Sequence, residues 1–218
     1  DRYKYLFRVM PTNTDVLFGR FLVPYLRDHL IPNVLQPALV EAGELDDSVT
    51  QGEPGYDPGY PGWPEKVNVS VVIEALDWTA ELREKMDIIG PAFFGPGQAK
   101  IVSQVGGHLY YGVSPLTKNF TSILQEMKDR GTHLIFHVLS GEEGLYFIKQ
   151  WRDMEVPAVP VGINVLYQMS EMWEWTGGNC EYEAVIGWMG TRTPITPLSV
   201  PFWDAYVERW GHAPIYTS

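Results

Sequence analysis

The chain has 218 residues, 45% of them hydrophobic, so it is long and apolar enough to bury the core of one domain. Its 27 acidic and 16 basic residues give a formal net charge of −11, and a surface this acidic repels nucleic acid and anionic lipid. The apolar runs are shorter than the ~20 residues that a membrane-spanning helix needs, so no direct membrane insertion of these residues is expected.

Strand-like and helical segments alternate along the sequence. Strands are predicted at residues 3–10, 66–73, 99–105, 133–139, 157–162 and 182–188, and helices at 15–30, 77–89, 120–130, 145–156, 166–175 and 200–210. In the clearest helix, apolar residues recur at helical spacing from Phe120 through Ile123 and Leu124 to Met127. This alternation predicts an α/β fold with a three-layer, doubly wound and mainly parallel sheet.

The segment 133–162 carries the most informative pattern in the chain. It reads HLIFHVL, SGEEG, LYFIKQWRDMEV and PAVPVG, which indicates a strand, a glycine-bracketed turn, a helix and a second strand. Such a crossover joins parallel strands in a right-handed sense. Ligands of open parallel sheets bind outside the carboxyl ends of the strands, where residues 140–144 are expected. We therefore expect this turn to contribute to a small-molecule site, with Glu142 and Glu143 complementing the dipole at the helix start.

Two segments interrupt the alternation. Residues 31–65, which include GEPGYDPGYPGWPE, form a connection far longer than the usual roughly two to six residues. We expect a solvated insertion there, with a contact surface for another chain or a missing domain as the alternative. Residues 191–218 begin with a Pro- and Thr-rich stretch and continue into one aromatic helix that has no evident packing partner.

Four segments, taken in order, resemble the type I periplasmic binding proteins, and especially the leucine/isoleucine/valine-binding branch of ABC importer receptors. They are YLFRVMPTNTDVLFGRFLVPYL, VNVSVVIEALDW, KNFTSILQEMKDRGTHLIFHVLSGEEGLYFIKQWRDMEV and TPLSVPFWDAYVERWGHAPIY. The first is similar to the family's crossing into its second lobe, and the second to the strand and turn that open the ligand site. The last is similar to the stretch after the return crossing. The likeness covers nearly the whole chain apart from residues 31–65.

The resemblance implies an α/β ligand-binding lobe at 1–189, the second of two, and assigns 190–218 to the return hinge and a helix of the first lobe. It implies a fragment of a longer, non-catalytic receptor that acts in the periplasm or outside the cell, including as a membrane-tethered lipoprotein. Its partners would be a small-molecule ligand, an amino acid or related organic acid or amide, and the permease of an ABC transporter. No cofactor and no metal are expected.

The resemblance also suggests ligand-binding residues in the first half of the lobe. Trp78 follows the strand 66–73, where the family places an aromatic side chain over the ligand, and a rigid aromatic face suits apolar groups and cations. A Trp packed at a helix start is the alternative. Tyr110 and Tyr111, in the loop after strand 99–105, are expected at the rim of the site or in ordinary surface packing.

Further candidates follow the two strands of segment 133–162. Ser140 and Gly141 match positions where the family contacts ligand, and small residues there leave backbone N–H groups at a helix start free to meet a carboxylate. Asn164 matches the position where the family's amino-acid binders bring a carboxylate to the ligand's ammonium group. An amide carries no charge, so either another acid such as Asp77 or Glu142 replaces that carboxylate or the ligand is not an α-amino acid.

Two other functions stay open on the sequence alone: a ligand-sensing domain of a receptor or regulator with the same fold, and a small α/β enzyme that uses the SGEEG turn. Against the enzyme, the sequence has no GxSxG, no GxGxxG opening a helix, no P-loop and no HExxH. His133 and His137 lie in an apolar strand, which favours a place in the core or at its edge over metal ligation. Cys180 is the single cysteine and is expected to be a buried structural thiol.

Overall fold

The structure, a computed structural model, describes residues 22–44, 67–93, 100–186 and 192–214. These residues divide into two compact units. Unit 1 contains the described residues up to Val71 together with Ala75–Tyr111, and unit 2 contains Val72–Glu74 together with the described residues from Gly112 onward. Strand β1 (Asn68–Glu74) therefore contributes its first four residues to unit 1 and its last three to unit 2.

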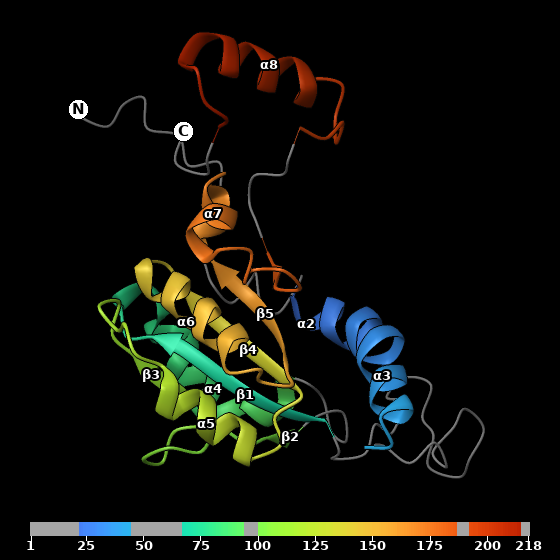
Figure 1. The fold of residues 1–218 in the computed structure, drawn as a ribbon, viewed down its shortest axis with the longest axis vertical. Helices are drawn as coiled ribbons and strands as arrows, with labels where there is room; N and C mark the ends of the chain where they lie inside the picture. The colour runs from blue at the N-terminus through green and yellow to red at the C-terminus, as the bar shows by residue number, and fades with distance from the viewer. Residues whose placement is uncertain (1–21, 45–66, 94–99, 187–191, 215–218) are drawn as a thin grey trace. The chain divides into compact units, whose positions relative to one another are not determined.

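A six-stranded sheet organises the described residues (Figure 1). Its strands follow the order β2–β1–β4–β5–β6, and β3 pairs with β1 beside this path. The bounds are Lys100–Ile101 for β2, Tyr111–Val113 for β3, Leu134–Leu139 for β4, Val159–Asn164 for β5 and Ala184–Val185 for β6. The pairs β1–β2, β4–β5 and β5–β6 are parallel, which confirms the predicted α/β fold with a mainly parallel sheet.

Strands β4 and β5 are the best-defined part of unit 2. They pair in parallel along all six residues of each, from Leu134 opposite Val159 to Leu139 opposite Asn164. Every residue of β4 is buried, as expected for a strand inside a parallel sheet that helices cover. The sequence of this strand is almost continuously apolar because both of its faces are buried.

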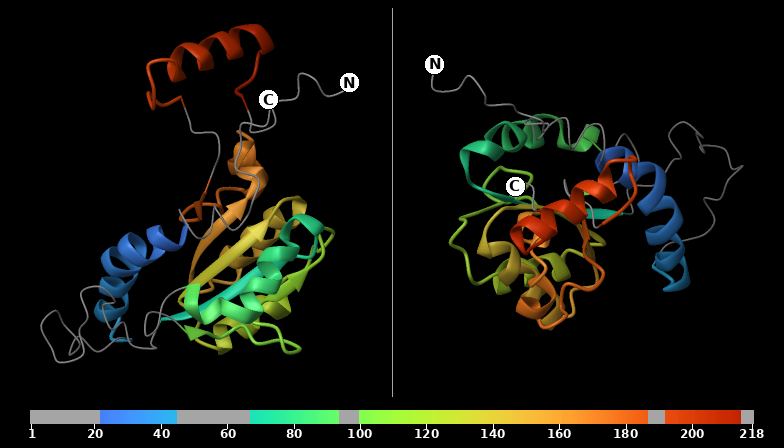
Figure 2. Two further views of the ribbon diagram at one scale, coloured as in Figure 1. Left: turned by 180° about the vertical axis from the view of Figure 1, so that it is seen from behind. Right: turned by 90° about the horizontal axis from the view of Figure 1, so that it is seen from above.

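Helix α6 (Glu142–Asp153) joins β4 to β5 and completes the predicted βαβ unit. It lies with α5 along one face of this part of the sheet, as Figures 1 and 2 show from three sides. Its inward face buries Phe147 and Ile148 completely. Trp151, 5% exposed, donates from its indole N–H to the carbonyl oxygen of Ala158 at 3.0 Å, which ties the helix to the start of β5.

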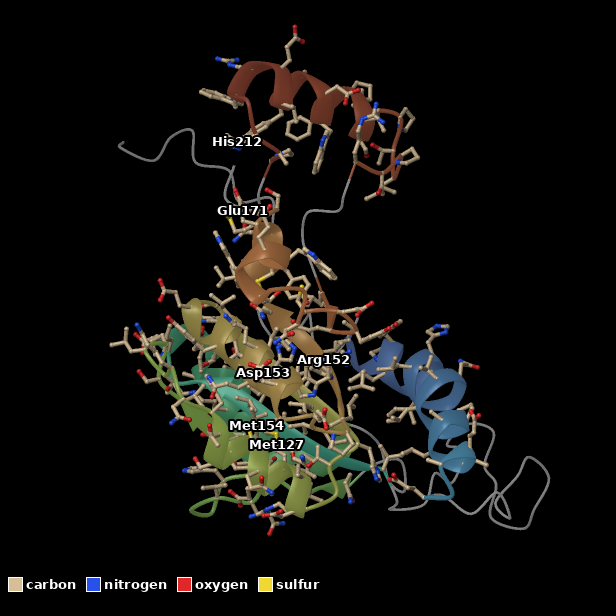
Figure 3. All side chains as sticks on the ribbon, in the orientation of Figure 1. Met127, Arg152, Asp153, Met154, Glu171 and His212 are labelled. Atoms are coloured by element: carbon tan, nitrogen blue, oxygen red, sulfur yellow. The ribbon has the colours of Figure 1, made fainter. Side chains whose placement is uncertain are left out.

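Helix α5 (Thr121–Asp129) packs beside α6. Met127 is fully buried at the end of the predicted apolar stripe. The next residue, Lys128, reaches the end of α6, where its Nζ donates to the carbonyl oxygen of Met154 at 2.8 Å. Met127 and Met154 are both labelled in Figure 3. The amphipathic pattern of this helix was therefore interpreted correctly.

Unit 1 begins with a helical run made of α2 (Val23–Tyr25), η2 (Leu26–Leu35) and α3 (Gln36–Glu41). The expectation that the helix ends near residue 30 and that an insertion starts at residue 31 is wrong for residues 31–41. Buried apolar residues recur at intervals of four, with one step of a single residue from Leu30 to Ile31, and so continue through this run: Leu22, Leu26, Leu30, Ile31, Leu35 and Leu39. The predicted strand 3–10 and residues 45–65 lie outside the described part of the chain.

The rest of unit 1 contains η3 (Asp77–Thr79), α4 (Ala80–Phe93) and a β2 strand much shorter than the predicted 99–105. Ser103 explains the early end of β2. Its Oγ accepts from the backbone N–H of Val71 at 3.0 Å and donates to the carbonyl oxygen of Leu109 at 2.9 Å. At this point a side-chain hydroxyl, rather than the backbone of the next strand, makes the hydrogen bonds to the main chain.

After β5 the chain forms η4 (Val165–Gln168), α7 (Met172–Thr176) and β6, and later α8 (Ser199–Trp210). The predicted single helix 166–175 is therefore wrong, because Met169 adopts an extended backbone between the two helical turns. Helix α8 confirms the prediction for 200–210. No helix among the described ranges is long and apolar enough to cross a membrane.

Candidate ligand-binding site

The order of the strands reverses at β1. The chain passes from β1 to β2 on one side of it and later places β4 on the other side. At such a reversal the carboxyl ends of the strands border a crevice, which is where open α/β sheets bind ligands. Glu74 ends β1 and Ser140 follows β4. The two residues are in contact, because the backbone N–H and the hydroxyl of Ser140 both donate to Glu74 Oε2, at 3.0 and 2.8 Å.

Glu143 folds back over the start of α6. Its Oε1 accepts from the backbone N–H groups of Ser140 and Gly141 at 3.0 and 2.9 Å, so it satisfies two amides that precede the helix. A Cβ atom on Gly141 would lie 2.6 Å from Glu143 Oε2. Glycine therefore leaves the space that the carboxylate occupies. We call Glu74, Ser140, Gly141 and Glu143 the switch-point cluster.

Two buried carboxylates share this cluster. Glu74 and Glu143 are both 0% exposed, and both accept a hydrogen bond from the same amide of Ser140. Burial, followed by the contact with Glu143, raises the pKa of Glu74 to about 7, although the Ser140 donors act in the opposite direction. Glu74 therefore exchanges its proton close to neutral pH.

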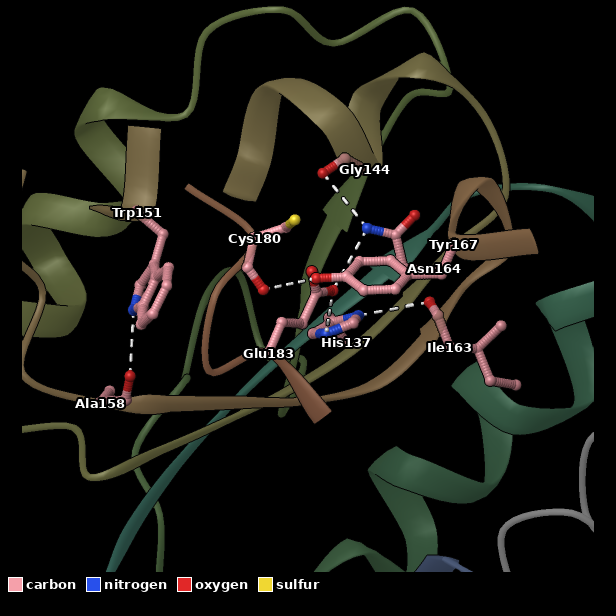
Figure 4. Close-up of polar contacts among 9 residues, drawn as sticks. All are labelled: His137, Gly144, Trp151, Ala158, Ile163, Asn164, Tyr167, Cys180 and Glu183. Carbon is pink, nitrogen blue, oxygen red and sulfur yellow. Dashed lines mark hydrogen bonds and ion pairs between the residues drawn. The ribbon is translucent and has the colours of Figure 1, made fainter. Parts of the chain in front are cut away.

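Asn164, the last residue of β5, belongs to a second polar group (Figure 4). Its Nδ2 donates to the carbonyl oxygen of Gly144 at 3.4 Å and to Glu183 Oε1 at 3.2 Å. The amide packs so closely on the first turn of α6 that a Cβ on Gly144 would lie 2.6 Å from Asn164 Oδ1. Asn164 is 2% exposed, and Oδ1 has no hydrogen-bond donor within the described residues.

His137 lies in β4 and contacts the same glutamate. Its Nδ1 is 3.2 Å from the carbonyl oxygen of Ile163, and it must donate there because a carbonyl can only accept. Its Nε2 is 3.0 Å from Glu183 Oε1, an ion-pair distance, although the angle lies outside hydrogen-bond geometry. Both side chains are fully buried. We call His137, Asn164, Tyr167 and Glu183 the amide cluster.

Tyr167 connects the segment after β5 to the segment before β6. Its hydroxyl donates to the carbonyl oxygen of Cys180 at 2.7 Å. Burial, and next the negative charge of Glu183, raise the pKa of Tyr167, so the phenol stays protonated and remains a donor. Cys180 is buried, as predicted. This hydrogen bond helps to hold the segment that carries Glu183.

The candidates from the first half of the lobe lie in unit 1. Asp77 and Trp78 begin η3, and both are exposed, Trp78 over 40% of its surface. Tyr110 and Tyr111 are 8% and 4% exposed, so they belong to the interior of the unit and are not the rim residues that the sequence suggested. Their apolar rings pack inside because they lead into β3.

The remaining candidates, Ser140, Gly141 and Asn164, lie in unit 2. Ser140 and Gly141 are half-buried at the carboxyl end of β4, where the sequence placed them. The expectation that their N–H groups are free is wrong, because the chain's own carboxylates Glu74 and Glu143 already accept from them. The two glycines of SGEEG leave space for the side chains of Glu143 and Asn164.

Sequence reasoning missed the two glutamates that contribute most to these clusters. Glu74 offered a signal, because it is a single acid at the carboxyl end of an apolar strand. Glu183 offered none, because only the pairing of β6 with β5 brings its segment beside Asn164. His137 was correctly placed in the core, but its contact with Glu183 was not foreseen.

Neither a known family model nor a curated protein matches the sequence. Solved structures do match the fold. A chain from Rhodospirillum rubrum, provisionally described as a branched-chain amino acid ABC transporter, matches with a TM-score of 0.54 and 19% identity, over 68% of this chain and 39% of its own. A chain from Silicibacter pomeroyi with the same description matches with a TM-score of 0.56 and 11% identity, over 91% of this chain and 40% of its own.

The fold is that of a type I periplasmic-binding-protein lobe. The predicted resemblance is thereby confirmed at the level of the fold, which is what identities of 11% and 19% establish. The chain spans 39–40% of the length of the two matched structures. Within the lobe, the switch-point cluster and Asn164 of the amide cluster lie at the carboxyl ends of β1, β4 and β5, the edge of the sheet that α/β proteins use for ligands.

Proposed function

We propose that this lobe is part of the extracytoplasmic substrate-binding component of an ABC importer, and that it binds a small amino acid or a related carboxylate or amide. The observation that supports this most directly is the switch-point cluster. It places half-buried Ser140 and Gly141 at the reversal of strand order, with donors and carboxylates within hydrogen-bond distance of one another. The fold shared with ABC transporter proteins supports the transport context.

In this proposal the lobe supplies one wall of a cleft, and a second lobe closes over the ligand by hinge motion. Closure follows because the ligand has more contacts in the closed state than in the open one. The closed receptor would then deliver its ligand to a permease from the periplasm or the cell exterior. Binding and release are the whole activity, so the site residues act as hydrogen-bond and packing partners rather than as catalysts.

Two chemical groups of the switch-point cluster can meet a ligand. The amides of Ser140 and Gly141 can donate to a ligand carboxylate if it displaces Glu143 Oε1. Glu74 can meet a polar group in either protonation state, because its pKa of about 7 lets it donate or accept near neutral pH. The cluster therefore suits small polar molecules that carry a carboxylate or an amide.

A titration of the ¹⁵N-labelled 218-residue chain followed by NMR tests the proposal. L-leucine, leucinamide, 4-methylpentanoate and benzoate would be added up to millimolar concentrations, since one lobe offers only part of the contacts of a closed cleft. We expect saturable shifts of the Ser140 and Gly141 amides with at least one of the four probes. If none of them moves these amides, the binding proposal is overturned.

The place of Trp78 in the site needs a separate test. Replacing Trp78 by Ala should weaken the affinity for whichever probe binds by about tenfold, because an aromatic contact contributes roughly 1 kcal/mol or more beyond its buried area. Trp173→Ala is the matched control, since Trp173 is also an exposed tryptophan, on α7, and was not predicted to touch ligand. Equal affinity of the Trp78 variant and the wild type would remove Trp78 from the site.

A further inference from the structure

The side chain of Asn164 has one orientation that its surroundings permit. Both groups within reach of its amide nitrogen, the carbonyl oxygen of Gly144 and Glu183 Oε1, are acceptors. The NH₂ end must face them, so the carbonyl end, Oδ1, faces the other way. Oδ1 has no donor within the described part of the chain, and the same holds for the second oxygen of Glu183, Oε2, so the cluster contains two buried acceptors without a partner.

Glu183 enforces this orientation, and His137 holds Glu183. A single carboxylate oxygen, Oε1, faces both Asn164 Nδ2 at 3.2 Å and His137 Nε2 at 3.0 Å. The side chain of Glu183 is fully buried, and the residue before it, Tyr182, has the positive φ of 72° that is uncommon outside glycine. The turn before β6 thus accepts a strained backbone and directs Glu183 inward.

The partnerless oxygen of Asn164 has an energetic consequence. A buried acceptor without a hydrogen bond costs about 1–3 kcal/mol, and a donor that reaches it recovers much of that free energy. Asn164 is directly followed by η4, all four residues of which are partly exposed. Asn164 also lies at the carboxyl end of β5, the edge of the sheet where a ligand is expected.

We propose that Glu183, held by His137, is a positioning residue that fixes Asn164 as a hydrogen-bond acceptor, so that the site selects ligands carrying a donor: an ammonium group, a primary amide or a hydroxyl. This inference rests on the proposed ligand-binding function. Glu183 Oε1 accepts from Asn164 Nδ2, and through this contact the charge of Glu183 polarises the amide. A ligand that has a carboxylate but no donor gains nothing at this position.

The substitution Glu183→Gln makes the proposal testable, because it should turn the amide of Asn164 around. Because the Nδ1 proton of His137 is donated to Ile163, its Nε2 can accept from the NH₂ group of the new glutamine. That NH₂ group then faces Asn164, which can present its own oxygen to it by giving up the 3.4 Å hydrogen bond to the carbonyl oxygen of Gly144. The NH₂ end of Asn164 would point to where Oδ1 was, and the site would offer a donor.

The ligand preference is read from a matched pair, L-leucine and 4-methylpentanoate, which differ only in the amino group. Titrations monitored by NMR should show that the wild type prefers L-leucine, and that Glu183→Gln lowers the ratio of the two affinities by about tenfold or more. Glu181→Gln is the control, since Glu181 is exposed in the same segment and loses the same charge. It should leave the ratio unchanged.

A second readout needs no ligand. The side-chain NH₂ resonances of Asn164 should shift in Glu183→Gln and stay in place in Glu181→Gln. If Glu183→Gln shifts these resonances but the leucine preference does not change, Oδ1 serves a bound water and the selectivity proposal is overturned, while the binding function stands. If neither of these two probes binds the wild type, the selectivity proposal is overturned, while the binding function is decided by the four-probe titration. Unmoved resonances in Glu183→Gln would overturn the positioning role by themselves.

Glu183→Asp covers the case in which Glu183→Gln does not fold. The aspartate keeps a carboxylate near His137, but its side chain is one methylene shorter and so lies farther from Asn164. We expect a folded protein by circular dichroism whose leucine preference is weakened without being reversed. An unchanged preference in a folded Glu183→Asp protein would count against the proposal in the same way as in the glutamine variant.

Discussion

The two polar clusters of unit 2 hold buried carboxylates in different ways. In the switch-point cluster, carboxylates accept from backbone amides, and Glu143 Oε1 accepts from residues only two and three positions away, whereas its Oε2 has no donor among the described residues. In the amide cluster, side chains from three separate segments contact one another, and neither Asn164 Oδ1 nor Glu183 Oε2 has a donor within the described part of the chain. The first arrangement secures the start of a helix, whereas the second joins segments that are far apart in the sequence.

Gly162→Ala should cause the largest loss of stability, and it should disrupt the amide cluster. Gly162 is the register partner of His137, and a Cβ there would lie 1.9 Å from the carbonyl oxygen of His137, so the strands must separate. We expect a loss of about 3 kcal/mol or more in urea unfolding, because backbone atoms cannot move aside as a side chain can.

Gly177→Ala is the control for that experiment. Gly177 also has a positive φ, but nothing lies within 4 Å of a Cβ there, so only the cost of about 1 kcal/mol for an alanine in a left-handed conformation is expected. If both alanine variants lose the same stability, the close approach of β4 and β5 at Gly162 is not what supports the amide cluster.

Glu74→Gln should have an intermediate effect that depends on pH. The pKa of Glu74 rises on folding from 4.5 to about 7, so the folded state holds the proton more tightly than the unfolded state. Its stabilising contribution is therefore fully present below pH 4.5 and is lost as the pH rises through about 7. The glutamine mimics the protonated acid and should remove this dependence.

The difference between the variant and the wild type isolates Glu74 from the other acids. Urea unfolding of both proteins at pH 5 and pH 8 should show that the wild type loses on the order of 2–3 kcal/mol relative to the variant at the higher pH. Parallel stabilities across this range would mean that Glu74 and Glu143 do not share a buried site.

Gly141→Ala and Gly144→Ala should have the smallest effects, and they separate the clusters from each other. Each new Cβ would meet a side-chain oxygen at 2.6 Å, Glu143 Oε2 in one case and Asn164 Oδ1 in the other, and side chains can shift. We expect losses of about 1–2 kcal/mol for Gly141→Ala, and less for Gly144→Ala, because alanine favours the helix interior by about 1 kcal/mol.

The functional readouts of these two variants should differ even where the stabilities do not. Gly144→Ala displaces the amide of Asn164, so it should lower the preference for L-leucine over 4-methylpentanoate. Gly141→Ala displaces Glu143, so it should expose the amides of Ser140 and Gly141 to faster hydrogen exchange. The same response in both variants would indicate that the two clusters form one cooperative network.

Most of the βαβ unit could be predicted from the sequence, whereas the longer-range connections could not. The apolar strand at 134–139 and the spacing of Ile148 and Trp151 are local patterns, and they produced correct elements. The helical run through residues 31–41 was missed because it was grouped with the long connection that contains GEPGYDPGYPGWPE. The single helix at 166–175 was wrong because nothing local marks the break at Met169.

The sequence by itself determined the α/β class, the parallel βαβ unit and the position of Ser140 and Gly141 at a strand's carboxyl end, because hydrophobic period and glycine placement act over a few residues. Only the tertiary structure decided which acids these residues meet. Ser140 contacts Glu74 from 66 residues away and Asn164 contacts Glu183 from 19 residues away. The pKa of Glu74 and the orientation of the Asn164 amide follow from those contacts, and strand order rather than local sequence creates them.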